Sequence, residues 1–424
     1  MTLEQLHAIF LSHPTVCTDT RKITKNCLFF ALKGPNFNGN EFAKQALEQG
    51  AAYAIVDESQ HETSDKCLLV KDVLQTLQNL ATFHRNYCSA RVVSLTGSNG
   101  KTTTKELIHA VLSKKYKTVA TKGNLNNHIG VPLTLLSIKA DTELAIVEMG
   151  ANHKEEIAFL CNIAQPDFGY ITNFGKAHLE GFGGIEGVIQ GKSELYQYLI
   201  PNGKYVFLNA DDPIQVEKLA SYIKKIGFST NNPEYFNIKL LHTNPFVVIE
   251  VENTTISTKL IGSYNFPNCC SAITMGKYFN VPLEEIKTAL ESYVPANNRS
   301  QIIEKNGFKI ILDAYNANPT SMQAAIHNFK SMPGTEKTLI LGDMFELGPE
   351  AMEEHQHISD LVLDHGFSEV YLVGENFFHT ASNFKKMESF SHLKEYLEKN
   401  PLQKGTLLIK GSRGMALERV LELL

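Results

Sequence analysis

A glycine-rich segment at residues 96–106, TGSNGKTTTKE, combines the residue types that bind nucleotide phosphates. It follows an apolar run at 92–97 and leads into a stretch with helical spacing, which is the strand–loop–helix context that phosphate binding requires. In such a loop, backbone N–H groups at the helix N-terminus face the phosphate oxygens. We predict that Lys101 lies near the β- and γ-phosphates of ATP and that Thr102 offers its hydroxyl to Mg²⁺. The other residues of the predicted ATP-binding loop are Gly97, Ser98, Asn99, Gly100 and Thr103.

This loop departs from the commonest phosphate-binding pattern at one position. The pattern G-x-x-x-x-G-K-[ST] requires a glycine five residues before Gly100, and this chain has Leu95 there. The segment is therefore G-x-x-G-K-T, shorter by two residues, which favours a particular subfamily over a generic ATPase. The alternative interpretation is a glycine-rich turn with an ordinary exposed lysine.

Glu148 and His178, which follow the glycine-rich segment in the chain, are candidates for metal binding. Glu148 ends the apolar run 143–150, and ligands of α/β sheets bind at the carboxyl ends of strands. A carboxylate there would support Mg²⁺, and the alternative is a solvated side chain at a strand end. His178 lies in a glycine-containing loop at 173–184, where it could contact a metal or a substrate or serve a structural purpose. Lys192 begins a helix-like segment shortly afterwards, and taken alone it is an ordinary solvated lysine.

Polar side chains follow other predicted strands or lie in loops near them. Asn126 and Asn127 belong to an amide-rich loop whose side chains could bind a polar substrate or cap a helix. Asp313 and Asn316 follow the apolar run KIIL, where they could hold a ribose or a water, and helix capping is the alternative.

A last pair of cationic side chains follows the final apolar run of the chain. Lys410 and Arg413 lie in the segment KGSRGM and are candidates for binding a carboxylate or a phosphate. The alternative for this segment is an ordinary helix start.

The elements that must position these residues form alternating strands and helices. Near-continuous apolar runs at 143–150, 168–174 and 205–209 are typical of parallel strands covered on both faces by helices. This alternation predicts a doubly wound α/β domain, and a second alternation begins at 308–315. The run FVVIEV at 246–251 is isolated and predicts a peripheral antiparallel piece.

The length of 424 residues is enough for about three domains. We predict an α/β chain with a small N-terminal domain at 1–86, a central ATP-binding domain at 87–296 and a Rossmann-like C-terminal domain at 297–424. The boundaries rest on the new start at Arg91 and on the polar stretch VPANNRS.

Composition excludes several classes of protein. The net charge of −5 argues against a nucleic-acid binder whose affinity depends on phosphate neutralisation. Seven scattered cysteines with no CxxC spacing indicate reduced thiols. No signal-peptide pattern and no apolar run of about 18 residues is present, so we expect a cytoplasmic protein without membrane insertion.

With these motifs in order, the chain resembles the Mur ligases over almost its whole length. The resemblance is carried by the short phosphate loop and by TKGNLNNHIGVPLT, VEMGANHKEEI, NFGKAHLEGFGG, LDAYNANP, GDMFELG and KGSRGMALE. Residues 19–58 resemble the UDP-binding domain of that family. The combination is most similar to the branch that adds D-alanyl-D-alanine, because the ligases that add earlier residues share only part of it.

The resemblance implies a reaction and its partners. ATP would activate the terminal carboxylate of UDP-N-acetylmuramoyl-tripeptide as an acyl phosphate, and the amine of D-alanyl-D-alanine would displace phosphate. It implies two Mg²⁺ ions, with Thr102 and Glu148 at the first and His178 at the second. It also implies that Lys192 reacts with CO₂ to form a metal-bridging carbamate. We expect Lys101, His178 and Lys192 to be the catalytic residues of a monomer.

Further roles follow from the same resemblance. Asn268, Arg299 and Asp313 match positions that face the adenine, the phosphates and the ribose. Two departures, Tyr264 in place of a frequent His and Ala314 in place of a frequent Ser, concern the adenine site. The residues implied to bind the other substrates are Thr20, Arg21, Lys33, Gly34, Asn126, Asn127, Asn316, Lys410 and Arg413.

Two rival functions stay open at this point. A folylpolyglutamate-synthetase-like ligase would share the short phosphate loop, but the N-terminal FFALKG segment favours a UDP site. A regulator that hydrolyses ATP only to change shape would not need polar loops at several strand ends. The sequence does not distinguish lysine from meso-diaminopimelate as the third residue of the acceptor peptide.

Overall fold

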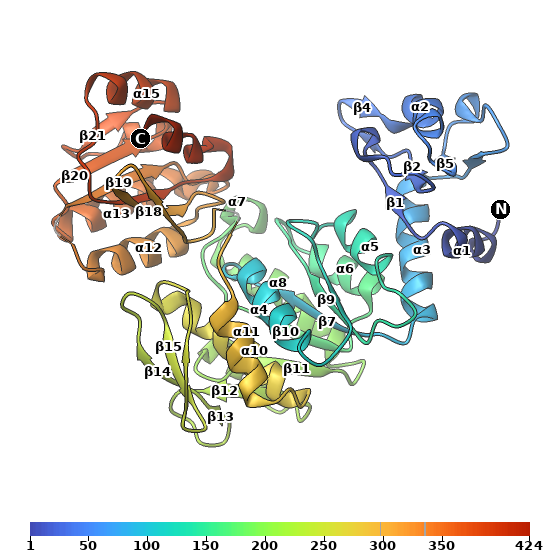
Figure 1. Ribbon diagram of the computed structural model, residues 1–424, viewed down its shortest axis with the longest axis horizontal. Coiled ribbons are helices and arrows are strands. Elements are labelled where there is room, and N and C mark those ends of the chain that lie inside the picture. Colours follow the sequence, from blue (N-terminus) through green and yellow to red (C-terminus); the bar gives the residue numbers. More distant parts are fainter. Residues whose placement is uncertain (297, 335) are drawn as a thin grey trace.

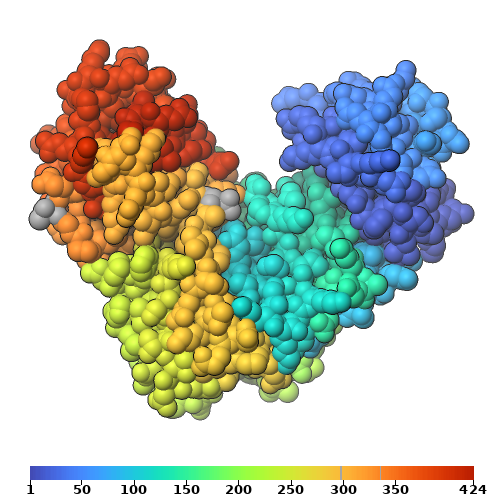
Figure 2. All heavy atoms as spheres, viewed as in Figure 1, coloured from blue at the N-terminus to red at the C-terminus, as the bar shows by residue number. Residues whose placement is uncertain are grey.

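The chain folds into three α/β parts, and the middle part of the sequence connects the other two (Figure 1). The structure is a computed structural model that describes residues 1–296, 298–334 and 336–424. The first and third parts stand apart over the middle one, and Figure 2 shows the open space between them. The predicted fold class, three α/β domains with a central doubly wound sheet, is confirmed.

The first part contains a four-stranded parallel sheet in the order β1-β2-β5-β6. Helix α3, Val73–Tyr87, begins at the N-cap Asp72, whose side chain accepts from the backbone N–H of Gln75. It packs against helices α5, Gly130–Leu135, and α6, Glu156–Ala164, of the middle part and so joins the two. The remaining elements are α1 Leu3–Ser12, β1 Val16–Cys17, β2 Leu28–Phe30, β3 Lys33–Gly34, β4 Phe37–Asn38, α2 Ala43–Glu48, β5 Tyr53–Val56 and β6 Cys67–Leu69.

The middle part is built on a seven-stranded parallel sheet in the order β13-β12-β11-β10-β7-β9-β8. Every residue of β9 is buried, as expected for a strand with helices on both faces. After β7 the chain forms β8 and β9 on one side of that strand, and it then crosses over to form β10 on the other side. The loop after β7 therefore lies where the strand order reverses, which is the position at which such sheets bind ligands.

These elements have the following bounds: β7 Arg91–Thr96, α4 Lys101–Leu112, β8 Thr118–Ala120, α5 Gly130–Leu135, β9 Leu144–Glu148, α6 Glu156–Ala164, β10 Phe168–Ile171, α7 Leu179–Phe182, α8 Ile185–Leu199, β11 Tyr205–Asn209, α9 Pro213–Lys218, β12 Lys225–Ser229, β13 Phe236–Asn237, α10 Phe266–Tyr278 and α11 Leu283–Ser292. A small antiparallel sheet, β14 Lys239–His242, β15 Val248–Val251 and β16 Thr254–Ser257, contains the isolated run of the sequence.

The third part has a six-stranded sheet in the order β17-β18-β22-β19-β20-β21, parallel except for the β17–β18 pair. Helix α12, Pro319–Ser331, begins with a capping box in which Asn318 and Ser321 each bond the other's backbone N–H. The other elements are β17 Gln301–Lys305, β18 Phe308–Asp313, β19 Lys337–Gly342, α13 Ala351–Asp364, β20 Glu369–Val373, α14 Glu375–Phe378, β21 Lys385–Met387, α15 Phe390–Lys399 and β22 Thr406–Lys410.

Two sequence-wide expectations can be compared with this structure. All seven cysteines are buried with free thiols. In the part of the chain that the structure describes, no helix has both the length and the apolar composition needed to span a bilayer.

Candidate active site

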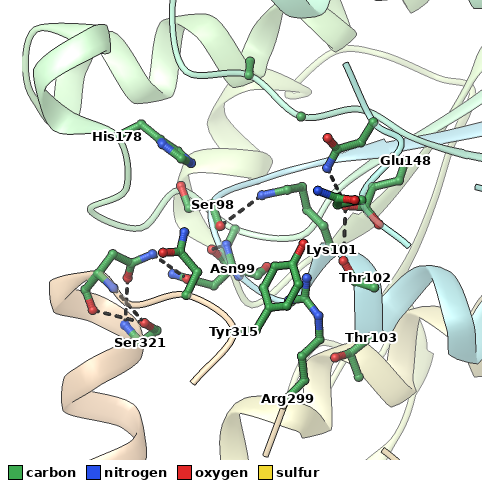
Figure 3. A pocket seen from close by; sticks show the side chains of 18 of the residues that line it. Ser98, Asn99, Lys101, Thr102, Thr103, Glu148, His178, Arg299, Tyr315 and Ser321 are labelled. Atoms are coloured by element: carbon green, nitrogen blue, oxygen red, sulfur yellow. Dashed lines mark hydrogen bonds between the residues drawn. The ribbon is translucent and has the colours of Figure 1, made fainter. Parts of the chain in front are cut away.

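A cavity of about 960 Å³ lies where the middle and third parts meet. Most of the residues singled out in the sequence line it (Figure 3). These are Ser98, Asn99, Gly100, Lys101, Thr102, Thr103, Asn126, Asn127, Glu148, His178, Asn268, Arg299, Asp313, Asn316 and Lys410. The walls do not include Gly97, Lys192, Arg413 or the four residues of the first part.

The phosphate loop connects the end of β7 to the start of α4. Gly97 and Gly100 have φ of 138° and 79°, a region that favours glycine, and a Cβ on Gly97 would lie 2.0 Å from Thr172 Oγ1. The Nζ of Lys101 folds back over the loop and donates to the carbonyls of Gly97 and Ser98 at 2.6 and 3.1 Å. Burial lowers the pKa of Lys101 to about 8, against the opposing effect of Glu148. The loop therefore presents helix N–H groups and one cationic side chain to the cavity.

Glu148 ends β9 with its side chain buried beside this loop. Its Oε1 accepts from Thr102 Oγ1 at 3.2 Å and from Asn126 Nδ2 at 2.8 Å. Its Oε2 has no hydrogen-bond donor among the described residues and lies 3.8 Å from Lys105 Nζ. A buried carboxylate oxygen with a free lone pair next to a threonine hydroxyl fits a hard cation such as Mg²⁺. Asn126, which we predicted to bind substrate, orients this carboxylate.

A Mg²⁺ ion here would need further oxygen ligands from water or phosphate. Within residues 1–296, 298–334 and 336–424 there is no group of three His, Cys, Asp or Glu side chains that could hold a metal. Such a sparse protein ligand set is typical of Mg²⁺ in nucleotide sites, because this ion keeps water and binds phosphate.

Taken alone, the local sequence led us to interpret Lys192 as a solvated lysine, and that interpretation is wrong. Its side chain is fully buried in α8, behind the cavity wall. The Nζ donates to the carbonyl of Ala151 at 2.9 Å and lies 4.8 Å from the ring centroid of Phe182. Burial, reinforced by the positive charge of Lys101, holds its pKa well below the ordinary lysine value. Both effects make the neutral amine more accessible than in an exposed lysine.

His178 lies in the loop after β10 with φ of 54°, and its ring points into the cavity (Figure 3). Its Nδ1 is 2.5 Å from Oε2 of Glu346, which belongs to the GDMFELG segment of the third part. The proximity of His178 lowers the pKa of the Glu346 carboxyl group. Our sequence reasoning noted this segment but did not select Glu346, since only the tertiary structure brings it to the histidine.

The far wall of the cavity contains a chain of polar contacts around Asp313. Its Oδ1 accepts from the backbone N–H of Ser300 at 3.0 Å, and its Oδ2 is 2.6 Å from Lys410 Nζ. Lys410 is almost fully buried, so this ion pair neutralises a lysine that we predicted to bind an anionic substrate. Tyr264, at the position of a family departure, donates to or accepts from Ser300 Oγ at 2.8 Å.

Two other predicted residues, Asn268 and Arg299, also line the cavity. Asn268 accepts from Thr104 Oγ1 at 3.0 Å and lies against Gly100, where a Cβ would come within 2.6 Å of its Oδ1. Arg299 stacks on Tyr315 with its Cζ 3.6 Å from the ring centroid. Arg413 lies on the same ring at 5.3 Å, outside the cavity wall. Tyr315 was missed because a single tyrosine after a strand carries no distinctive sequence signal.

The predicted UDP-binding residues lie in the first part, away from this cavity. Arg21 is exposed and pairs with Asp19 at 2.8 Å, next to Thr20. Lys33 pairs with Asp57 at 2.9 Å, and Gly34 follows it in the β3–β4 hairpin. Their predicted role stays a prediction.

Comparison with known proteins identifies relatives over the whole chain. Three sequence models match: the Mur ligase family catalytic domain at 15–88, the Mur ligase middle domain at 95–276 and the Mur ligase glutamate ligase domain at 298–413. The UDP-N-acetylmuramoyl-tripeptide–D-alanyl-D-alanine ligase of Bacillus subtilis strain 168 is 35% identical over 96% of this chain and 92% of its own. The ligase of the same name from Escherichia coli K12 is 34% identical over 99% and 95%.

Solved structures agree with these relatives. MurF from Acinetobacter baumannii matches with a TM-score of 0.82 at 30% identity, over 96% of this chain and 92% of its own. MurF ligase from Thermotoga maritima, solved with ADP, matches with a TM-score of 0.83 at 27% identity over 97% of both chains. An FPGS complex with AMPPCP and folate shares the fold alone, with a TM-score of 0.60 at 18% identity over 83% of this chain and 94% of its own.

Proposed function

The chain belongs to the Mur ligase family, and we propose that it is the ATP-dependent ligase that joins D-alanyl-D-alanine to UDP-N-acetylmuramoyl-tripeptide in peptidoglycan precursor synthesis. The observation that carries this function is the short phosphate loop, which opens beside a buried carboxylate into a cavity shared with the third part. Relatives with this activity cover nearly the whole chain. The folylpolyglutamate-type alternative is supported by shared fold alone.

The reaction must activate a carboxylate that does not react with amines by itself. An oxygen of the tripeptide carboxylate attacks the γ-phosphorus of ATP, the bond to the bridging oxygen breaks, and ADP leaves. The amine of the dipeptide then attacks the acyl carbon, and phosphate departs with the electron pair of the C–O bond as the amine loses a proton. The amide forms because phosphate is a far better leaving group than oxide.

The residues of the cavity can bind and neutralise the transferring group. The N–H groups at the start of α4 and the Nζ of Lys101 would stabilise charge on the γ-phosphoryl oxygens. Thr102 and Glu148 would hold a Mg²⁺ ion, which supplies charge neutralisation when it is bound. Asp313, oriented by Lys410 and Ser300, would accept from the ribose hydroxyls. Closure of the third part over the loop would keep water from the acyl phosphate.

For Lys192 we propose carbamoylation. The neutral Nζ would attack CO₂, one C–O π bond would break, and a proton would pass to solvent to leave a carbamate anion. The buried position and the lowered pKa of the amine support this proposal. The carbamate and His178 would then be ligands for a second Mg²⁺ ion. Lys192→Ala should be severely impaired and partly restored by a short added carboxylate, whereas Lys192→Arg should stay impaired.

We propose further that the first part binds the UDP portion and the third part the dipeptide, in a cytoplasmic monomer. The buried free thiols suit a reducing compartment. The decisive assay measures phosphate release from ATP with each substrate alone and with both. We expect release only when both are present; release from ATP alone would instead indicate a regulatory ATPase.

A further inference from the structure

The N-cap residue of the third part's helix α12 reaches across to the phosphate loop. Asn318 is almost buried, and its Nδ2 donates to Oδ1 of Asn99 at 2.7 Å. The Oδ1 of the same amide accepts from the backbone N–H of Ser321 at 2.9 Å and caps the helix. The Asn318 side chain therefore caps its own helix through Oδ1 and donates to the loop of the middle part through Nδ2.

On the other side, the backbone of Asn99 is held by residues that follow β10. Its N–H donates to Asn173 Oδ1 at 3.0 Å. Its carbonyl accepts from Asn173 Nδ2 at 3.0 Å and from Thr172 Oγ1 at 2.6 Å. The side chain of Asn99 is thus directed to the third part while its backbone is fixed within the middle part. Figure 3 shows this residue between the loop and the start of α12.

A second contact runs beside this one. The backbone N–H of Lys176 donates to Thr320 Oγ1 at 3.0 Å, and the Lys176 ammonium pairs with Glu354 of α13. The phosphate loop, the segment after β10 and the start of α12 form one hydrogen-bonded network across the domain boundary. Displacement of α12 would remove the only side-chain partner of Asn99 Oδ1 that the described residues provide.

We propose that Asn318 is a positioning residue for the phosphate loop, through which docking of the third part and binding of the ATP phosphates favour each other. This inference rests on the proposed ATP-binding role of that loop. A loop that is fixed before the ligand arrives binds more tightly, because less conformational entropy is lost on binding. Coupling of this kind is reciprocal, so bound nucleotide also favours the docked arrangement.

The test uses the full-length protein and two substitutions at the same helix start. Asn318→Ser retains a good N-cap residue but is too short to reach Asn99. Ser321→Ala, the matched control, weakens the capping box and leaves the Asn318–Asn99 contact in place. Calorimetry with Mg²⁺ and the non-hydrolysable analogue AMP-PNP measures the dissociation constant. Losing one neutral hydrogen bond predicts an increase of about fivefold for Asn318→Ser and little change for Ser321→Ala.

Kinetics separate positioning from general damage. Asn318→Ser should raise the KM for ATP by the same factor, with kcat at saturating ATP nearly unchanged, because bound nucleotide orders the loop. Asn99→Ala combined with Asn318→Ser should weaken AMP-PNP binding no more than Asn99→Ala alone.

The outcomes distinguish this inference from the proposed function. Equal affinity of wild type and Asn318→Ser, or equal weakening by Asn318→Ser and Ser321→Ala, overturns the positioning role and leaves the proposed function intact. Failure of the wild type to bind AMP-PNP overturns both.

Discussion

Replacing the buried Lys192 by methionine should leave the stability of the middle domain nearly unchanged and at the same time abolish ligation. Methionine has a similar volume, so it can occupy the same fully buried space in α8. What it removes is an amine with a single hydrogen bond, to the carbonyl of Ala151. A buried polar group that lacks most of its partners is maintained at the expense of stability, and catalytic need is the reason to retain it.

The size of the effect follows from two opposing changes. Loss of the donor to Ala151 costs about 1–3 kcal/mol if the carbonyl is left without a partner. Against this, the buried amine leaves most of its hydrogen-bonding capacity unused, and removing such a group recovers about 1–3 kcal/mol. The two changes are of similar size, so we expect a net change of no more than about 2 kcal/mol in either direction, which shifts Tm by at most roughly 8 °C. Turnover should fall about a hundredfold or more, because the proposed metal ligand is lost.

Lys105 provides the matched control, because it is the other lysine in this region that is nearly fully buried. Its Nζ lies 3.8 Å from Glu148 Oε2, so Lys105→Met leaves a buried carboxylate unpaired and should lower Tm. Differential scanning calorimetry of the three proteins, together with the phosphate-release assay, makes the comparison. A Tm decrease in Lys192→Met as large as that in Lys105→Met would refute the reasoning, since Lys192 would then be a structural residue.

Four further outcomes are expected. Lys101→Ala should remain folded and lose about a hundredfold or more in turnover; near-normal turnover would contradict the phosphate-loop assignment. Gly97→Ala should abolish AMP-PNP binding, because the new Cβ would collide with Thr172, and normal binding would show that the loop tolerates this change. Chelation of divalent cations should stop ligation and added Mg²⁺ should restore it, so activity in excess chelator would exclude the metal role. Burial lowers the pKa of both His7 and His84, which contact each other at 3.0 Å. The unfolded chain binds their protons below about pH 6.5 while the folded chain does not, so stability should fall as pH falls from 6.5 toward the folded pKa values; a urea midpoint that is equal at pH 7.5 and 5.5 would contradict this.

Local sequence patterns were sufficient for much of this protein. The strand–loop–helix pattern around Lys101 identified the phosphate loop, because glycine spacing and a following helix are properties of a few adjacent residues. Apolar runs located β9 and its neighbours, since a strand buried on both faces must be continuously apolar. Together with the order of motifs they were enough for the confirmed fold class and family. The domain boundaries and the roles of the individual site residues stay predictions.

The tertiary structure decided what depends on contacts between distant segments. Lys192 reads as a solvated lysine in sequence and is fully buried in the fold, because its surroundings come from the loop around Ala151 and from Phe182. Glu346 meets His178 only through docking of the third part. The pairing of Lys410 with Asp313 likewise requires two parallel strands that are far apart in the chain to become neighbours. Burial and charge pairing are sums over all nearby groups, and most of those groups are remote in sequence, so no local pattern can encode them.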